Sequence, residues 1–72
     1  METVECLSGS TYAERPLAFA WEGGRLEIEA ILSQWRTEEE RWFRVRTRDG
    51  RTFDLAYNEA ENGWKIHPIT GG

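Results

Sequence analysis

The sequence predicts an all-β fold, an antiparallel meander of about five strands curled into a small SH3-like or half-open barrel. Two short turn sequences, Glu-Gly-Gly-Arg at residues 22–25 and Arg-Asp-Gly at residues 48–50, each separate runs of alternating apolar residues. That pattern is typical of β-hairpins. With 72 residues the chain forms one domain with a small core. We expect the core over residues 16–69, a loop over 8–15 and a flexible tail over 70–72.

The first turn predicts a hairpin with Gly23 and Gly24 as its two-residue loop, because both can take positive φ. Glu22 then pairs with Arg25, and apolar alternation divides the two strands into an inner and an outer face. The inner face holds these pairs: Trp21 with Leu26, Phe19 with Ile28, and Leu17 with Ala30. The outer face holds Ala18, Ala20, Glu27 and Glu29.

The second turn predicts a three-residue loop, Arg48-Asp49-Gly50, with Gly50 left-handed in a bulge. A two-residue Asp49-Gly50 loop would mix apolar and charged residues on both faces. The three-residue loop gives two inner pairs, Val45 with Phe53 and Phe43 with Leu55. The outer pairs are Arg44 with Asp54, Arg46 with Thr52, and Trp42 with Ala56.

The two ends of the chain add shorter elements. Residues 3–7 predict a short strand, and residues 58–63 a loop leading into a last strand. In that strand Trp64 and Ile66 continue the inner face, and Pro68 indicates that the strand lies at an edge of the sheet or ends there, because proline donates no ladder hydrogen bond. Trp21, Phe19, Phe43, Phe53 and Leu55 are expected to close the core.

Residues 25–42 are ambiguous, since Ile28, Ile31, Leu32 and Trp35 also recur at helical spacing. A helix here would lack a good N-cap and a closing Gly or Asn after Arg36. We therefore favour a strand. As a strand it directs Leu26, Ile28, Ala30 and Leu32 inward, and Ile31, Ser33 and Trp35 outward.

No residue pattern indicates catalysis, a metal site or a cofactor. The chain has one His and one Cys, too few for a zinc site and without an orienting partner for either. His67 is expected to be an ordinary strand-end residue and Cys6 a small buried hydrophobe. We expect no enzyme activity, no cofactor and no small-molecule substrate. Because one Cys closes no disulfide and no apolar run is long enough for a membrane span, we expect a cytoplasmic protein.

The predicted outer face is the one unusual surface, and its candidate binding residues are Ile31, Trp35, Trp42, Arg44 and Arg46. Three interpretations stay open. The residues form a local aromatic and cation–π cover, or they bind a protein partner or a second copy of the chain, or they bind single-stranded nucleic acid by stacking and phosphate contacts. Residues 36–51 carry six Arg against four acids, but the net charge of −4 disfavours nucleic acid.

Residues 16–66 also resemble a family of small bacterial domains of unknown function. The shared pattern is Phe-x-Trp-x-Gly, then Trp-Arg, then Arg-Val-x-Thr-x-Asp-Gly-x-x-Phe-x-Leu and a closing Trp. The matching positions are Pro16, Phe19, Trp21, Gly23, Leu32, Trp35, Arg36, Val45, Asp49, Gly50, Phe53, Leu55 and Trp64. Members occur as free-standing proteins and as a tail on some Y-family polymerase-like proteins. The resemblance implies a link to DNA repair and no catalytic residue.

Overall fold

The structure is a computed structural model that describes residues 3–6 and 15–69. Six β-strands form one antiparallel meander in the order of the chain. They are β1 (Val4–Cys6), β2 (Pro16–Trp21), β3 (Gly24–Arg36), β4 (Glu40–Thr47), β5 (Thr52–Asn58) and β6 (Gly63–Ile69). The all-β expectation is confirmed, with six strands rather than about five because residues 4–6 pair with β2. Most of the loop expected over 8–15, the tail over 70–72 and the Cys6 side chain lie outside the described residues.

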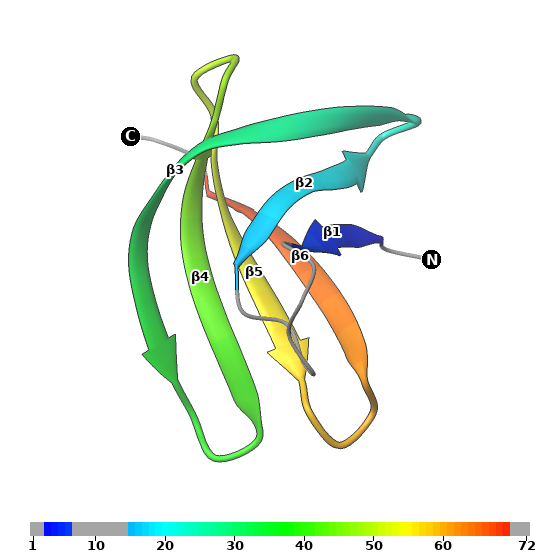
Figure 1. Ribbon diagram of the computed structural model, residues 1–72, viewed down its shortest axis with the longest axis vertical. Coiled ribbons are helices and arrows are strands. Elements are labelled where there is room, and N and C mark those ends of the chain that lie inside the picture. The colour runs from blue at the N-terminus through cyan, green and yellow to red at the C-terminus, as the bar shows by residue number, and fades with distance from the viewer. Residues whose placement is uncertain (1–2, 7–14, 70–72) are drawn as a thin grey trace.

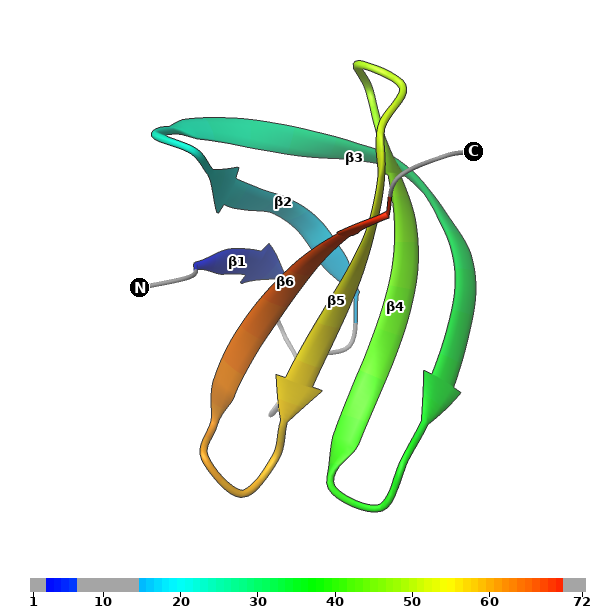
Figure 2. The same cartoon turned by 180° about the vertical axis from the view of Figure 1, so that it is seen from behind.

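The shape of the domain follows from β3, which has 13 residues and belongs to two arms of the sheet. Its first residues pair with β2, and its remaining residues pair with β4. Figures 1 and 2 show β3 running alongside β2 and then curving down beside β4, so that the sheet curls into a half-open barrel. Residues 25–36 are therefore extended, and the helical alternative is wrong.

The core lies between the two arms of the curled sheet. Phe53 of β5 links the arms, since its ring lies 4.9 Å from that of Phe19 and 5.3 Å from that of Trp21, both edge to face. The fully or nearly fully buried members of the cluster are Phe19, Phe43, Val45, Phe53, Leu55 and Ile66. Trp21 and Trp64 pack around this cluster, so the five residues expected to close the core all contribute to it.

The second hairpin has the predicted register throughout. Val45 pairs with Phe53 and Arg44 with Asp54, and Gly50 has a φ of +90° as the three-residue loop requires. The 58–63 loop is also confirmed, with a turn between β5 and β6. Strand β6 lies at an edge of the sheet, where Pro68 costs no ladder hydrogen bond.

Strand β3 does not keep a simple two-residue alternation. Its register against β4 shifts between Ile28 and Ala30 and again between Ile31 and Ser33, and each extra residue of a β-bulge moves the following side chains to the opposite face. Ile28 and Ile31 consequently both pack on the core. Leu32 is 45% exposed. The expectation that Ile31 points outward and Leu32 inward is wrong, because it assumed an unbroken alternation.

The first hairpin also differs from the prediction. Its loop is Glu22-Gly23, both with positive φ, of 48° and 81°, and Trp21 pairs with Gly24 rather than with Leu26. A glycine at the second loop position satisfies this turn as well. Turn propensity alone favoured Gly23 and Gly24 as the loop. The observed register instead places Phe19 opposite Leu26, and this puts Glu22 in the left-handed region.

Two residues of β2 differ from the prediction in their burial. Leu17 is 44% exposed, and Ala18 is fully buried. Ala18 lies between Glu5 of β1 and Glu27 of β3 in the register. Arg25 forms hydrogen bonds to both of these carboxylates, so long side chains extend over the small Ala18 and explain its burial.

Candidate functional site

The outer aromatic face comprises Trp35, Trp42, Arg44, Arg46 and His67, from β3, β4 and β6. Its position follows from β4, in which Phe43, Val45 and Thr47 are buried and the intervening residues point to the outside of the sheet. Trp35 pairs with Trp42 in the β3–β4 register. The structure thus brings together four of the five predicted binding residues. Ile31 is not one of them, because the β3 bulges direct it to the core.

Three rings form a stack across the outer aromatic face. The centroids of Trp35 and Trp42 lie 5.7 Å apart with planes 10° from parallel, and those of Trp42 and His67 lie 5.5 Å apart at 22°. Ala56 of β5 pairs with Trp42 and is 1% exposed. Because Ala56 carries only a methyl group, the Trp42 ring can extend over β5 and reach β6.

Neighbouring side chains cover most of the Trp42 indole. One ring neighbour is Trp35 and the other is His67, and its Nε1 is buried without a hydrogen-bond partner among the described residues. Trp35 is 38% exposed, whereas Trp42 is only partly exposed. The stack therefore offers a ligand chiefly the Trp35 ring and the imidazole of His67.

Arg44 is fixed in place by two interactions. Its Nε and Nη2 donate to the two carboxylate oxygens of Asp54 at 2.8 and 2.9 Å, and its guanidinium carbon lies 5.6 Å from the centre of the Trp35 ring. The hydrogen bonds to Asp54 raise the pKa of Arg44. Bidentate pairing with a mostly buried carboxylate restrains the guanidinium geometrically and holds it against the indole.

Arg46, like Arg44, is paired with a carboxylate. Its Nε donates to the Glu29 carboxylate at 2.9 Å, and its Nη2 lies 2.9 Å from the same oxygen. Each arginine of the outer aromatic face therefore has a carboxylate partner. A phosphate group would have to compete with that carboxylate, so the face presents arranged donors and rings rather than an excess of positive charge.

Sequence reasoning missed His67 and Glu29 as members or partners of this surface. The signal for His67 was present, because extending the predicted β5–β6 hairpin from the 58–63 loop sets His67 opposite Asp54, as observed. The Glu29–Arg46 pair depends on the β3 bulges, and no turn sequence predicts those bulges. Among residues 3–6 and 15–69, no group of three or more His, Cys, Asp or Glu could hold a metal ion.

Together these features define a small half-open β-barrel domain with an ordered aromatic and arginine surface. A family model described as a domain of unknown function, DUF6504, matches residues 2–68, and the chain belongs to this family. No curated protein and no solved structure gives a significant match. Within the described part of the chain, no helix is long and apolar enough to cross a membrane.

Proposed function

We propose that the domain is a non-catalytic interaction module that acts in the cytoplasm and binds a protein through its outer aromatic face. The main partner that we propose is a second copy of the same chain. The observation that carries the proposal is the pre-formed Trp35–Trp42–His67 stack, held beside an arginine that Asp54 fixes. Trp and Arg are the residue types most enriched at interface hot spots, where rigid side chains lose little entropy on binding.

The arrangement suits a protein surface better than a string of bases. Base stacking needs an open ring face, but Trp42 already has ring neighbours on two sides. Arg44 and Arg46 are paired with carboxylates, which reduces the attraction of phosphate. A protein partner can instead pack against the exposed Trp35 and His67 and leave both ion pairs intact.

Light scattering over a concentration series tests the self-association. We expect the wild-type protein to show a concentration-dependent dimer that Trp35→Ala abolishes. Leu17→Ala is the matched control, because Leu17 is similarly exposed and belongs to β2. A wild-type protein that stays monomeric at every concentration contradicts self-association through this face, and so does a dimer that Trp35→Ala leaves unchanged.

An accessory role in binding single-stranded DNA is the alternative. It is supported by the interleaving of Trp and Arg on one face and by the resemblance to domains that end some Y-family polymerase-like proteins. Titration with a labelled oligonucleotide at low and physiological salt tests it, since electrostatic binding weakens with salt. An unchanged tryptophan fluorescence at low salt would rule the alternative out.

A further inference from the structure

The second half of β3 has an edge that no described strand covers. Strand β2 pairs with residues 24–27 of β3, and β4 pairs with residues 28–36 on the other side. Figure 1 shows β2 and β3 diverging beyond this point while β3 continues beside β4. Beyond residue 28, the edge of β3 away from β4 is therefore unpaired within the described part of the chain.

The hydrogen-bond pattern shows which backbone groups point out of this edge. The Thr37 N–H donates to the Glu40 carbonyl at 2.9 Å, so this opposed pair is a hydrogen-bonded one. Such pairs alternate along an antiparallel ladder, and the register is regular from Ser33 to Arg36. The N–H and C=O groups of Gln34 and Arg36 therefore face away from β4, where an added strand could bind them.

The other edges of the sheet are better protected against an added strand. Strand β1 has three residues, and β6 carries Pro68 and Lys65, both of which discourage pairing. The stretch from Ser33 to Arg36 contains neither Pro nor Lys. The bulges that disturb β3 lie before it, so they restrict regular pairing to this stretch without preventing it.

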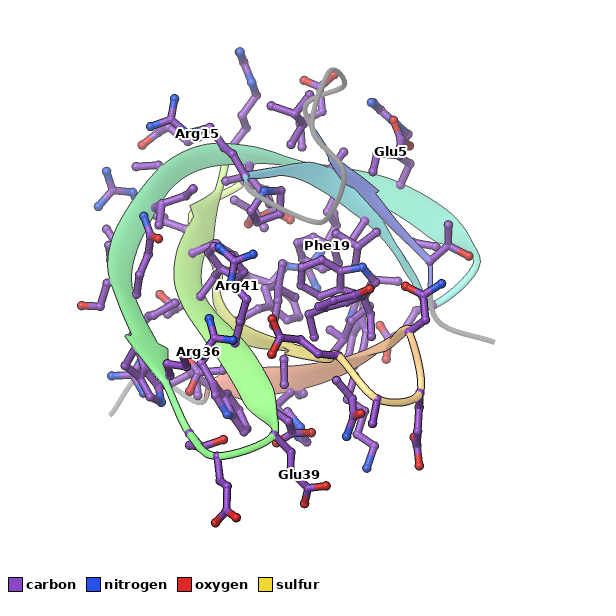
Figure 3. All side chains as sticks on the ribbon, turned by 60° about the horizontal axis from the view of Figure 1, so that its bottom comes forward. Glu5, Arg15, Phe19, Arg36, Glu39 and Arg41 are labelled. Atoms are coloured by element: carbon purple, nitrogen blue, oxygen red, sulfur yellow. The ribbon has the colours of Figure 1, made fainter. Side chains whose placement is uncertain are left out.

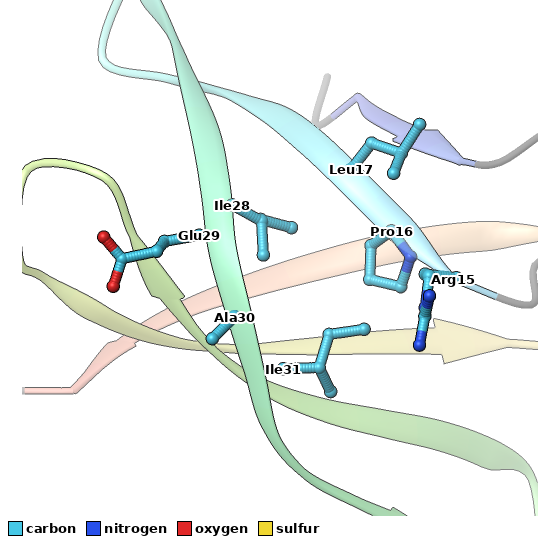
Figure 4. A pocket seen from close by; sticks show the side chains of 7 residues that line it. All are labelled: Arg15, Pro16, Leu17, Ile28, Glu29, Ala30 and Ile31. Carbon is cyan, nitrogen blue, oxygen red and sulfur yellow. The ribbon is translucent and has the colours of Figure 1, made fainter.

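A hollow of about 330 Å³, lined by both apolar and charged residues, continues from this edge toward β2. Figure 4 shows Ile28 and Ile31 pointing from β3 toward Pro16 and Leu17 of β2, while Glu29 points away. The large hydrophobic residues that are exposed in the described part of the chain are Leu17, Leu32 and Trp35. Leu17 lines the hollow, and Leu32 follows Ile31 on β3.

The same region is bordered by cationic side chains. Arg36 and Arg41 face each other at the far end of β3 and β4, and Arg15 lines the hollow; Figure 3 shows these three residues around the open side of the barrel. Arg36 is 60% exposed and contacts Glu59 through one nitrogen at 2.6 Å. That contact uses one guanidinium nitrogen of Arg36, so a ligand carboxylate can bind the remaining nitrogens beside Glu59.

We propose that the edge from Ser33 to Arg36 takes up an extended acidic segment of a partner protein as an added antiparallel strand. Its acidic residues lie beside Arg36, and an apolar residue further along enters the hollow near Ile31. Six strand residues at about 3.3 Å each cover that distance. The main-chain hydrogen bonds provide affinity, and the hollow and arginines provide specificity, as in other strand-addition complexes.

A second copy of the chain is a poorer occupant. Symmetric pairing confined to this regular stretch would bring Arg36 and Arg41 of both copies together around one short ladder. Like charges at such short distances oppose association. The proposal uses the backbone edge and the inner side of β3, so it does not depend on the outer aromatic face.

The test uses the intact chain and a blocked synthetic peptide, Glu-Thr-Glu-Thr-Val-Thr-Val. In an antiparallel strand its Glu residues lie beside Arg36 and its Val residues at the hollow, and the amides of those residues face β3. In NMR titration we expect the amides of Gln34 and Arg36 to shift and to gain protection from exchange. A peptide N-methylated at its Glu and Val residues should lose binding, whereas one N-methylated at its Thr residues should keep it.

Charge variants give an independent readout. Arg36→Glu should weaken peptide binding about tenfold, because a favourable cross-strand charge pair becomes repulsive. Arg48→Glu, the matched control with the same charge change on the exposed 48–50 turn, should leave binding within about twofold of wild type. A peptide with Lys in place of Glu should not bind.

Several results would overturn the proposal. They are an absence of binding at about millimolar peptide, equal loss with both N-methylated peptides, shifts confined to Trp35 and His67, and a wild-type dimer formed through the β3 edge. His67→Ala, a change on the outer aromatic face but on β6 rather than on the β3 edge, should leave peptide binding unchanged. A failure of the outer-face proposal and a failure of this one would therefore be told apart.

Discussion

At the scale of single residues, Asp49 shows how a short loop determines a carboxyl group's chemistry. Arg51 Nε donates to the Asp49 carboxylate at 2.9 Å, and the hydroxyl of Thr47 donates to its other oxygen. These hydrogen bonds, that of Arg51 first, lower the pKa of Asp49 from 3.8 to about 2. The charged carboxylate of Asp49 thus connects the end of β4 to the start of β5 at the 48–50 loop.

The lowered pKa predicts a contribution to stability that depends on pH. Because the folded pKa is below the unfolded value, the contribution is fully present above about pH 4 and is lost as the pH falls toward about 2. An NMR titration of the Asp49 carboxyl should have its midpoint near pH 2.

Thermal melts provide the controls for this assignment. Asp49→Asn should lower the melting temperature at neutral pH and reduce its change between about pH 4 and 2. Glu5→Gln, at another carboxylate whose pKa an Arg25 hydrogen bond lowers, should leave the Asp49 midpoint where it is. A midpoint close to 3.8 would contradict the loop geometry.

Ile31 and Leu32 are adjacent residues that the β3 bulges send to opposite environments. Ile31 packs on the core, so Ile31→Ala should lower the free energy of unfolding by about 1–3 kcal/mol, less than for a fully buried isoleucine. Leu32→Ala should change it by less than about 0.5 kcal/mol because Leu32 is exposed. Urea unfolding of the two variants measures both values, and the reverse order would mean that β3 alternates simply.

At the scale of elements, the first hairpin contains a residue that does not suit its turn. Glu22 has a φ of 48°, a left-handed conformation that costs a residue with a long side chain about 1 kcal/mol. Asn tolerates this region and is favoured in such turns. Glu22→Asn should therefore raise the free energy of unfolding by about 0.5–1 kcal/mol, as measured by denaturant unfolding.

Gly23→Ala is the opposing control for this turn. No atom lies within 4 Å of the Cβ position at Gly23, but its φ is +81°, so an alanine there is strained by its backbone rather than by a clash. We expect a loss of about 1 kcal/mol. If Glu22→Asn destabilised the protein, Glu22 would be making a favourable contact that outweighs its backbone strain.

At the scale of the whole molecule, stability depends on contacts that join the two arms of the sheet. Phe53 touches the rings of Phe19 and Trp21, and Phe53→Ala should remove about 3–5 kcal/mol. A domain of this length is stable by only about 4–11 kcal/mol. We expect the variant to be largely unfolded or to melt far below the wild type in circular dichroism. A near-normal melting temperature would show that the arms hold together without this residue.

Much of this fold was predictable from local signals. The Asp49-Gly50 turn and the alternation around it determine the β4–β5 register. The Arg44–Asp54 pair and the position of Trp42 opposite Ala56 could therefore be predicted from the sequence. The Trp35–Trp42 contact needed only that residues 25–36 run extended. Ile31 was misplaced because bulges carry no turn residue that would reveal them.

The sequence by itself determined the all-β class, the β4–β5 hairpin and the aromatic residues of the core, because turn chemistry and two-residue alternation act over a few neighbours. Only the tertiary structure decided the placing of the first turn, the bulges in β3 and the unpaired edge of β3. Each of these features depends on how β3 bends so that it pairs with β2 in one arm of the sheet and with β4 in the other. That bend is set by packing between segments distant in the chain, which no local pattern encodes.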